Sequence, residues 1–543
     1  MTKNKSNTII LCGGKINYSN LPVNTNTNNS MIPVNGKPVI SWIIEDLIEK
    51  KILSVQIVLL QENTHLKNFL KRVFNNKINL IINELEESSD ILQSLYHGLK
   101  ESDINLPTRV ILGDTLIRDS FAQSHDMIYI QEVEDCHRWC TVEYDEEFLA
   151  QKYYDKVYHA PLPYMALCGY YFFSNTSALL EIIQKCIEKG KNQLSDILTV
   201  YQKKTPIKVV QAKKWFDFGS IDNLIKAKQG LLQSRYFNTL TINPILNTIT
   251  KISEFDEKLR DELDWYRLLP EELRVVSPRI LNSEEINGKL NLVQEYYGYP
   301  TLAELYLYSD IEEEVWISIF KKLLELHKIF LKYNITLNKS DVETIYIVKT
   351  IERVKTLEKD EYWKNIFEYP EVVINGEVYQ NFHALEDKII EKCRLLSENT
   401  DGTIIHGDYC FSNILFDLNN QIIRLIDPRG SFGKKGIYGD PRYDLAKLRH
   451  SICGFYDYIV AEMFEIENIN NKFSVEFFIN EVTIESSTKF DSLIENIGYK
   501  SKDIQFIEGL LFISMLPLHK DKPQRQKAMY TRGIQIINKV LCE

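Results

Sequence analysis

Three polar residues in the C-terminal half of the chain stand at spacings that suit phosphoryl transfer from ATP. The segment HGD ends at Asp408, Asn413 follows five residues later, and Asp427 comes directly after the apolar run IIRLI. Such a transfer needs a carboxylate that orients and deprotonates the attacking hydroxyl, and oxygen ligands for the magnesium ions that bridge the phosphates. Asp408 suits the first task, and Asn413 with Asp427 suits the second. The spacing therefore favours a phosphotransferase site over ordinary turn chemistry.

The downstream segment GDPRYDLAKL strengthens this interpretation. Together with the HGD segment it resembles the catalytic and metal loops of the aminoglycoside phosphotransferase and choline kinase family, which has a protein-kinase-like fold. By that resemblance Asp444 braces the catalytic loop, and Lys251 with Glu262 holds the α- and β-phosphates of ATP. The segment LVQEYYGYPTLAEL resembles the hinge between the two lobes of such a fold, where backbone groups near Glu295 and Tyr297 meet the adenine.

The acceptor of the phosphoryl group is less well defined than the donor. The resemblance extends over about residues 240–540, and INPILNT stands in place of a glycine-rich loop. Acceptors in this family are cations that call for carboxylates or aromatic faces. The acidic stretch YIVAEMFEIENINNKFSVEFFINE offers both, although it is more typical of a solvated helical face. Arg429 and Arg442, next to the catalytic loops, equally suit a sugar acid or a phosphate.

The N-terminal half places polar loops at the ends of predicted strands. From residue 8 to about 230, short apolar strands alternate with amphipathic helices, a pattern typical of a mostly parallel sheet covered by helices. Gly13 and Gly14 follow the first strand, and Asp114 follows the strand RVIL. Ligands of open α/β sheets bind at the carboxyl ends of the strands. We therefore expect these loops to converge on one site, together with Asp217 of the segment WFDFGS.

The order of six segments in this half resembles the sugar-1-phosphate nucleotidyltransferase (NTP transferase) family: IILCGG, MIPVNGKPVISWII, VILGDTLI, ALCGYYFFSN, LSDIL and WFDFGS. By that resemblance Gly13, Gly14 and Lys15 contact the nucleotide, and Asp114 and Asp217 hold the divalent metal ion. A substrate phosphate then attacks the α-phosphate of an NTP and expels pyrophosphate, with electrostatic stabilisation contributing most of the catalysis.

The glycine loop departs from this family pattern in its charge. The family usually carries an Arg shortly after the glycines and a Lys just before the segment that resembles MIPV, whereas this chain has Asn17–Ser19 and Asn28–Ser30 at those places. Loss of one preorganised donor typically reduces the rate by a factor on the order of 10² to 10³. Nucleotidyl transfer therefore requires Lys15, Lys156 or residues elsewhere to replace the missing cations.

One cluster of potential metal ligands is interpreted as part of the fold and not as a metal site. The segment EDCHRWC brings Cys136, His137 and Cys140 close together, but a metal site would need one or two more ligands. We interpret the segment as a strand with Trp139 in the core.

The composition of the chain argues against several other functions. A formal net charge of −11 is opposite to the basic surface that neutralises nucleic-acid phosphates. Nine cysteines scattered over 543 residues do not form a disulfide framework and indicate reduced thiols. No run approaches the roughly 18 apolar residues of a membrane span. We expect a cytoplasmic protein that binds small molecules and no nucleic acid, and its oligomeric state stays open.

These observations predict an α/β protein of two domains. Residues 1–235 are expected to form a Rossmann-like, GT-A-like nucleotidyltransferase domain with a mostly parallel sheet. Residues 236–543 are expected to form a kinase-like α+β phosphotransferase domain, with a small β-rich lobe at about 236–300 and a large helical lobe at about 301–543.

The two resemblances together imply consecutive reactions. The C-terminal domain would phosphorylate a small alcohol or sugar with ATP and Mg²⁺, and the N-terminal domain would join the product to a nucleotide from CTP, UTP or GTP. Such a bifunctional enzyme would make an activated precursor for capsule or cell-surface polysaccharide. The alternative is a kinase with a single activity, whose N-terminal domain only binds nucleotide or acts as a scaffold.

Overall fold

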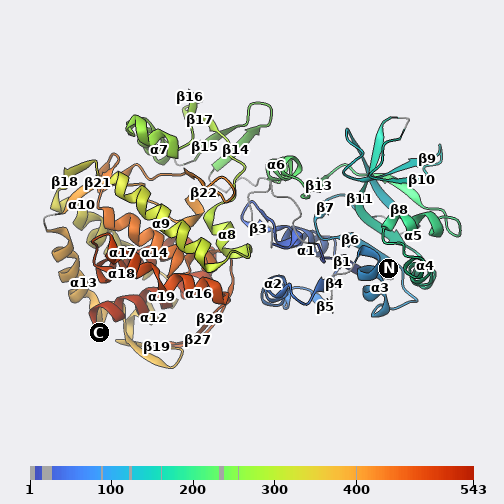
Figure 1. The fold of residues 1–543 in the computed structure, drawn as a ribbon. Coiled ribbons are helices and arrows are strands. Elements are labelled where there is room, and N and C mark those ends of the chain that lie inside the picture. Colours follow the sequence, from blue (N-terminus) through green and yellow to red (C-terminus); the bar gives the residue numbers. More distant parts are fainter. Residues whose placement is uncertain are drawn as a thin grey trace. The chain divides into compact units, whose positions relative to one another are not determined.

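The chain forms two compact units, which the computed structural model describes for residues 6–14, 27–86, 90–121, 125–159, 162–231, 238–254, 256–398 and 400–542 (Figure 1). One unit contains Met1–Leu231 and Tyr308–Asp310, and the other contains Leu232–Leu307 and Ile311–Glu543. Lys15 and Asn17–Ser19, which the sequence singled out, lie outside the described residues.

The N-terminal unit is built on a nine-stranded sheet in the order β10-β9-β11-β6-β1-β4-β5, in which β8 also pairs with β11 and β12. The strands are β1 (Asn7–Leu11), β4 (Ser54–Leu60), β5 (Asn79–Leu85), β6 (Thr108–Leu112), β8 (Met127–Val133), β9 (Cys140–Tyr144), β10 (Ala150–Asp155), β11 (Tyr164–Phe173) and β12 (Lys208–Gln211). Neighbours among β6, β1, β4 and β5 run parallel, as the alternating pattern predicted.

Helices and two small strand pairs complete this unit. The helices are α1 (Val39–Glu49), α2 (Thr64–Phe74), α3 (Ile91–Lys100), α4 (Thr176–Glu188), α5 (Leu194–Tyr201) and α6 (Ile221–Gly230). The small strand pairs are β2 (Pro33–Val34) with β3 (Lys37–Pro38), and β7 (Thr115–Ile117) with β13 (Trp215–Asp217). A core of aliphatic and aromatic side chains from β1, β6, β8 and β11 packs against α3, α4 and α5, and this packing fixes the strand ends that carry the site.

The C-terminal unit begins with a small lobe of four antiparallel strands in the order β14-β15-β17-β16 and one helix. These elements are β14 (Asn238–Asn243), β15 (Thr248–Ser253), α7 (Asp256–Leu268), β16 (Ile280–Ile286) and β17 (Lys289–Glu295). Leu259 and Leu263 of α7 pack against Leu290 and Leu292 of β17. This packing holds α7 against the sheet and sets its polar face toward the rest of the unit.

The large lobe consists mainly of helices, drawn in yellow to red in Figure 1. They are α8 (Leu302–Tyr308), α9 (Glu313–Phe330), α10 (Lys339–Glu343), α11 (Lys349–Leu357), α12 (Glu361–Glu368), α13 (Phe382–Ser397), α14 (Pro441–Ile452), α15 (Tyr456–Val460), α16 (Glu481–Thr488), α17 (Phe490–Asn496), α18 (Ser501–Met515) and α19 (Pro523–Leu541). Within the described ranges, no helix is both long and apolar enough to cross a membrane.

Short strands interrupt these helices. They form the sheets β18 (Asn334–Thr336) with β21 (Asp401–Ile404) and β26 (Tyr438–Gly439), β22 (Ile414–Asp417) with β23 (Ile422–Leu425), and β24 (Ser431–Phe432) with β25 (Lys434–Lys435). A fourth sheet has the order β20-β19-β28-β27, with β19 (Glu371–Ile374), β20 (Glu377–Gln380), β27 (Phe464–Ile469) and β28 (Lys472–Phe477).

The hairpin of β27 and β28 corrects the interpretation of the acidic stretch as a helical face. Within β27 the side chains alternate between partly buried and exposed, a period of two residues that belongs to a strand. Asn470 in the turn has φ +52°, a left-handed conformation that asparagine tolerates and that a tight hairpin turn requires. The carboxylates of this stretch are therefore spread along a sheet, and they do not form one face of a helix.

Candidate functional sites

The loop that carries Asp408 is braced by a buried carboxylate. β21 ends at Ile404, and the peptide N–H groups of His406 and Gly407 donate to the two oxygens of Asp444 at 2.7 and 2.9 Å. Asp444 lies in the first turn of α14 and is fully buried. Burial raises the pKa of its carboxyl group to about 7, although the two peptide donors act in the opposite direction. This places Asp444 where the family resemblance expects a bracing residue.

Each carboxylate oxygen of Asp408 has a partner within the protein. Asn413 donates from Nδ2 to Asp408 Oδ2 at 2.9 Å, and Lys447 of α14 lies with its Nζ 2.9 Å from Oδ1. Burial would raise the pKa of Asp408, but the charge and hydrogen bond of Lys447 outweigh it and lower the pKa to about 2. The group is therefore a carboxylate at neutral pH, able to accept a hydrogen bond from a substrate hydroxyl. Lys447 was not identified from the sequence, because nothing in the spacing of GDPRYDLAKL shows which of its residues turns inward.

Lys251, Glu262 and Asp427 form a chain of charges. Lys251 on β15 lies with its Nζ 2.7 Å from Glu262 Oε2 on α7 and 2.5 Å from Asp427 Oδ1. Lys251 and Glu262 are buried, and the charges of Asp427 and Glu262 raise the pKa of Lys251 against the effect of burial. The Lys–Glu contact expected from the sequence is thus present, and Lys251 also reaches the predicted metal residue Asp427. Their role toward ATP remains a prediction.

The two predicted magnesium ligands of this unit lie next to each other. The peptide N–H of Ile426 donates to the backbone oxygen of Asn413 at 3.0 Å, which ties the loop of Asn413 to the residue before Asp427. Because Nδ2 of Asn413 bonds to Asp408, the amide oxygen points the other way. Asp427 has φ +57°, a strained conformation for a residue other than glycine that is often found at functional sites. The amide and carboxylate oxygens suit Mg²⁺, which takes oxygen ligands.

Several hydrogen-bonding groups of the hinge residues already have partners within the small lobe. The hydroxyl of Tyr297 donates to Glu295 Oε2 at 2.6 Å, so the carboxylate of Glu295 already has a partner within the protein. The peptide N–H of Glu295 donates to Arg279 at 3.0 Å, and that of Tyr296 donates to Asn247 at 2.8 Å. An adenine contact would therefore use other backbone groups of the hinge, for which the N–H of Tyr297 is a candidate.

Arg442, one of the two arginines suggested for an anionic acceptor, is engaged elsewhere. Its Nη2 lies 2.6 Å from Asp440 Oδ2 and donates to the backbone oxygen of Leu396 at 2.6 Å. This guanidinium fastens the start of α14 to the end of α13. Arg429 has a different environment, with its Nη1 donating to the hydroxyl of Tyr443 at 3.0 Å. The structure therefore separates two residues that the sequence could not distinguish.

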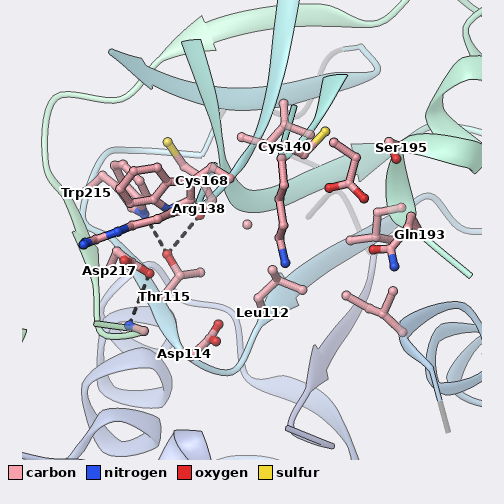
Figure 2. A pocket seen from close by; sticks show the side chains of 18 of the residues that line it. Leu112, Asp114, Thr115, Arg138, Cys140, Cys168, Gln193, Ser195, Trp215 and Asp217 are labelled. Atoms are coloured by element: carbon pink, nitrogen blue, oxygen red, sulfur yellow. Dashed lines mark hydrogen bonds between the residues drawn. The ribbon is translucent and has the colours of Figure 1, made fainter. Parts of the chain in front are cut away.

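The N-terminal unit brings its two candidate metal ligands into one pocket with a volume of about 260 Å³. Asp114 follows β6, and Asp217 ends β13, whose pairing with β7 sets Asp217 opposite Thr115. Figure 2 shows both carboxylates on one side of this pocket, with Gln193 and Ser195 on the other. Two segments about 100 residues apart in the chain thus line one pocket, and their role as metal ligands stays a prediction.

The electrostatics of this pocket suit a divalent cation. Burial and the neighbouring charge of Asp114 raise the pKa of Asp217 to about 6, and burial also raises the pKa of Asp114. Asp217 accepts hydrogen bonds from the side-chain amide of Asn223 at 2.6 Å and from the peptide N–H of Gly219 at 3.4 Å, and Asp114 accepts one from the side-chain amide of Asn29 at 3.5 Å. A metal ion would compensate two carboxylates that otherwise repel each other. Asp114 and Asp217 would hold it, and it would polarise a phosphate oxygen when bound.

The sheet register places the glycine loop at the edge where this pocket lies, although Gly13 and Gly14 do not line the pocket. Because β1 and β6 pair in parallel up to Leu11 and Leu112, Gly13 and Gly14 end at the same edge as Asp114. The peptide N–H of Asn29 donates to the backbone oxygen of Gly14 at 3.1 Å, and a Cβ on Gly14 would lie 3.0 Å from Asn29 Nδ2. Asn29, one of the residues Asn28–Ser30 that stand where the family usually carries a lysine, therefore connects Gly14 to Asp114 and contributes no charge.

Two cations line the same pocket and could replace the missing charge. Lys156 follows β10, and Arg138 donates from Nη1 to the hydroxyl of Ser220 at 3.3 Å. Trp139 also lines the pocket, with its ring 6.0 Å from that of Trp215 at a steep angle. The expectation that Trp139 lies on a strand in the core is wrong, because β9 begins only at Cys140 and the preceding residues form bends at the pocket rim.

Comparisons with known families agree with this division of the chain. Residues 7–234 match the family model described as nucleotidyl transferase, and residues 225–468 match the one described as phosphotransferase enzyme family. The chain therefore fuses two domains of enzyme families. The nucleotidyltransferase-like fold and the kinase-like fold expected from the sequence are those of the two matched families. A search of curated protein sequences gave no match.

Similar solved structures each cover about two fifths of this chain. A candidate glucose-1-phosphate thymidylyltransferase from Bacillus anthracis, solved with sucrose, is 19% identical over 41% of this chain and 94% of its own, with a TM-score of 0.37. HddC from Yersinia pseudotuberculosis, complexed with GMP-PN, is 18% identical over 42% and 100%, with a TM-score of 0.34. A UDP-glucose pyrophosphorylase complexed with UDP-glucose is 22% identical over 41% and 97%, with a TM-score of 0.34.

Proposed function

We propose that the phosphotransferase domain transfers the γ-phosphoryl group of ATP to a small alcohol or sugar, and that the nucleotidyl transferase domain joins the phosphorylated product to a nucleotide. The product would be a nucleotide-activated precursor, and its use for capsule or cell-surface polysaccharide in the cytoplasm is part of the proposal. The first reaction makes a phosphomonoester and the second consumes one. That match between product and substrate is the reason for joining the two activities in one pathway.

The chain of contacts from Glu262 through Lys251 to Asp427 is the observation that best supports the first activity. In this proposal Lys251 would contact the phosphates of ATP, and Asn413 and Asp427 would supply oxygen ligands for Mg²⁺ beside it. Asp408 would orient the acceptor hydroxyl and accept its proton, while Asn413 and Asp427 would hold the metal ions. The charge of Lys447, next to Asp408, would help to stabilise the transferred phosphoryl group.

Support for the second activity comes from the pocket of Asp114 and Asp217. Lys156 and Arg138 at this pocket would bind the phosphates of an NTP and of the phosphorylated substrate, in place of the missing cations of the glycine loop. Gly13 and Gly14 would face the nucleotide through their backbones. Which of CTP, UTP and GTP is used depends on contacts with the base, for which no residue is proposed.

A second candidate function is favoured by one observation. The residues Asn28–Ser30 stand where the family usually carries a lysine, and Asn29 contacts Asp114 without contributing a positive charge. A domain with these residues could bind a nucleotide without transferring it, and the chain would then be a kinase with a single activity.

Measurement of two products separates these functions. The full chain is incubated with ATP, Mg²⁺, a panel of alcohols and sugars, and each of CTP, UTP and GTP in turn. Release of ADP reports the kinase, and release of pyrophosphate that depends on the phosphorylated product reports the transferase. Phosphorylation without pyrophosphate under any condition would contradict the bifunctional enzyme, and absence of phosphorylation of every acceptor would contradict the kinase.

A further inference from the structure

Three cations of the large lobe lie close together without a carboxylate partner. Lys349 and Arg353 lie one turn apart on α11, and Arg429 follows two residues after Asp427. Among the described residues, no carboxylate lies within ion-pair distance of any of the three. Like charges four residues apart on a helix repel each other. Burial and the neighbouring charges of Arg429 and Arg353 lower the pKa of Lys349 to about 8, against the opposing effect of Tyr443. We call these three residues the cationic cluster.

Hydrogen bonds to neighbouring groups hold the three side chains of the cationic cluster in place. Arg429 Nη1 and Lys349 Nζ donate to the hydroxyl of Tyr443 at 3.0 and 3.3 Å. Arg353 donates from Nη1 to the backbone oxygen of Ser514 at 2.7 Å. A π-helical turn directly before Lys349 alters the register of the chain, a feature that is common at functional sites. Each cation is thus held by a hydroxyl or a backbone oxygen, and among the described residues none of the three forms an ion pair with a carboxylate.

The cationic cluster adjoins the catalytic loop. The peptide N–H of Arg429 donates to the backbone oxygen of His406 at 2.9 Å, and a Cβ on Gly407 would lie 2.8 Å from Arg429 Cβ. The stem of Arg429 therefore packs directly on the residue before Asp408. Lys447, one turn after Tyr443 on α14, bridges to Asp408 at 2.9 Å. Asp408 therefore lies beside the cationic cluster, and its own ion pair is with Lys447.

Other cations of the same lobe that are buried or partly buried are compensated. Arg442 pairs with Asp440, and Arg449 pairs with Asp491 and Glu508. Because an unpaired charge away from water is unfavourable, a fold normally supplies a partner, as it does for these two arginines. The cationic cluster lacks such a partner within the described chain. A ligand with negative charge would provide one.

We infer that the acceptor of the phosphoryl group carries an anionic group, a carboxylate or a phosphate, which Lys349, Arg353 and Arg429 bind beside Asp408. This inference rests on the proposed kinase activity and narrows its acceptor to hydroxy acids or alcohols that already carry a phosphate. Choline, ethanolamine and aminoglycosides are unsuited, because their cationic groups would be repelled by the same cluster. Arginine and lysine together fit the geometry of carboxylate and phosphate oxygens.

The reaction follows from this placement. The anionic group of the acceptor binds the cationic cluster, and the hydroxyl on the same molecule lies against Asp408. The hydroxyl oxygen forms a bond to the γ-phosphorus of ATP while the bond from that phosphorus to the bridging oxygen of ADP breaks. ADP leaves with the electron pair, and Asp408 accepts the hydroxyl proton. The product then carries a new phosphate in addition to its original anionic group.

Binding of inorganic phosphate tests the cationic cluster without requiring turnover. The full chain is saturated with Mg²⁺ and a non-hydrolysable ATP analogue, so that the nucleotide position is filled, and phosphate is titrated by calorimetry. Lys349→Met and Arg429→Met are each expected to weaken binding by roughly tenfold or more, because each removes a charge-assisted contact. Lys355→Met, which removes an exposed lysine of the same helix, should leave binding unchanged. Equal affinity in wild type and both cluster variants would overturn the inference.

A panel of related acceptors identifies the anionic group. Glycerol, glycerate, glycerol phosphate and ethanolamine are compared by ADP release, with glycerate and glycerol phosphate distinguishing a carboxylate from a phosphate. The anionic members are expected to have the higher kcat/KM, and this preference should disappear in Lys349→Met. Preference for glycerol or ethanolamine would overturn the inference.

A variant of the catalytic loop keeps the two proposals distinguishable. Asp408→Asn should bind inorganic phosphate at least as tightly as wild type but phosphorylate nothing. Phosphate binding without turnover in the wild type would therefore contradict the kinase and not the anion site. Turnover in the wild type, together with phosphate binding that Lys349→Met does not change, would contradict the anion site and not the kinase.

Discussion

At the scale of single residues, Tyr443 reports most directly on the cationic cluster. Burial alone would raise the pKa of Tyr443, but the charges of Lys349, Arg429 and Lys447 outweigh it and lower the pKa to about 7. The phenol is therefore deprotonated above that pH and protonated below it. A bound anion would neutralise the same cations, so the pKa of Tyr443 would rise and the phenolate would take up a proton.

We accordingly expect a tyrosinate absorption in the near ultraviolet at about pH 8 that decreases when inorganic phosphate is added. The measurement is a difference spectrum between wild type and Tyr443→Phe, which isolates this residue from the other 29 tyrosines of the chain. The absorption should be absent at about pH 6, below the lowered pKa. A spectrum that does not change with phosphate would show that Tyr443 does not sense an anion.

The residues of the catalytic site differ in how far the sequence could identify them. Asp408, Asn413 and Asp427 lie within 20 residues of one another, and their types and spacing alone indicated one site. The contact of Lys251 with Glu262 was expected from the resemblance to a kinase-like fold. Lys349 and Lys447 could not be expected, because lysines on amphipathic helices are usually solvated. Only the packing of α11 and α14 shows that these two are partly or fully buried.

At the scale of elements, the contact between α7 and the metal loop positions the kinase site. Gly430 has φ +64°, and a Cβ at this position would lie 2.0 Å from the backbone oxygen of Asp261. Asp261 precedes Glu262 on α7, so any residue larger than glycine pushes the helix away from the loop of Asp427. This close approach explains why glycine follows Arg429.

Gly430→Ala should therefore reduce kinase turnover by at least roughly tenfold, because it displaces Glu262 from Lys251. It should also lower the free energy of unfolding by about 1 to 3 kcal/mol through overpacking. Gly288→Ala is the matched control, since Gly288 has φ +75° with nothing within 4 Å of an added Cβ. ADP release and urea denaturation measure the two effects. Equal loss of turnover in both variants would show that backbone strain, and not the position of α7, is responsible.

Elements with a long, regular hydrophobic pattern could be predicted from the sequence, whereas short strands could not. Helix α3 (Ile91–Lys100) is one of the amphipathic helices that the pattern of the N-terminal half predicts, since its apolar period is unbroken and Asp90 forms a capping box with Gln93. The hairpins β19–β20 and β27–β28 were missed. Their strands are only four to six residues long, and the turn residues Asn375 and Asn470, both with positive φ, were the signals that could have found them.

At the scale of the whole molecule, the two domains form two compact units, and each contains its own group of candidate site residues. The pocket of Asp114 and Asp217 is lined by residues of the first unit, and the contacts of Asp408 involve residues of the second. In the proposed function, the phosphomonoester that one group of residues makes is the substrate of the other group. Substitutions in one site should then leave the chemistry of the other intact.

Asp217→Asn and Asp408→Asn are therefore expected to block different steps. With alcohol, ATP and NTP all present, Asp217→Asn should accumulate the phosphomonoester and release pyrophosphate at least 10²-fold more slowly, on the order expected for loss of a key electrostatic group. Asp408→Asn should form neither product from the alcohol, yet should release pyrophosphate normally when the phosphomonoester is supplied. Phosphorus NMR of the mixture follows both products at once. Loss of phosphorylation in Asp217→Asn would contradict the independence of the sites, and normal pyrophosphate release in that variant would remove the N-terminal pocket as the site of nucleotidyl transfer.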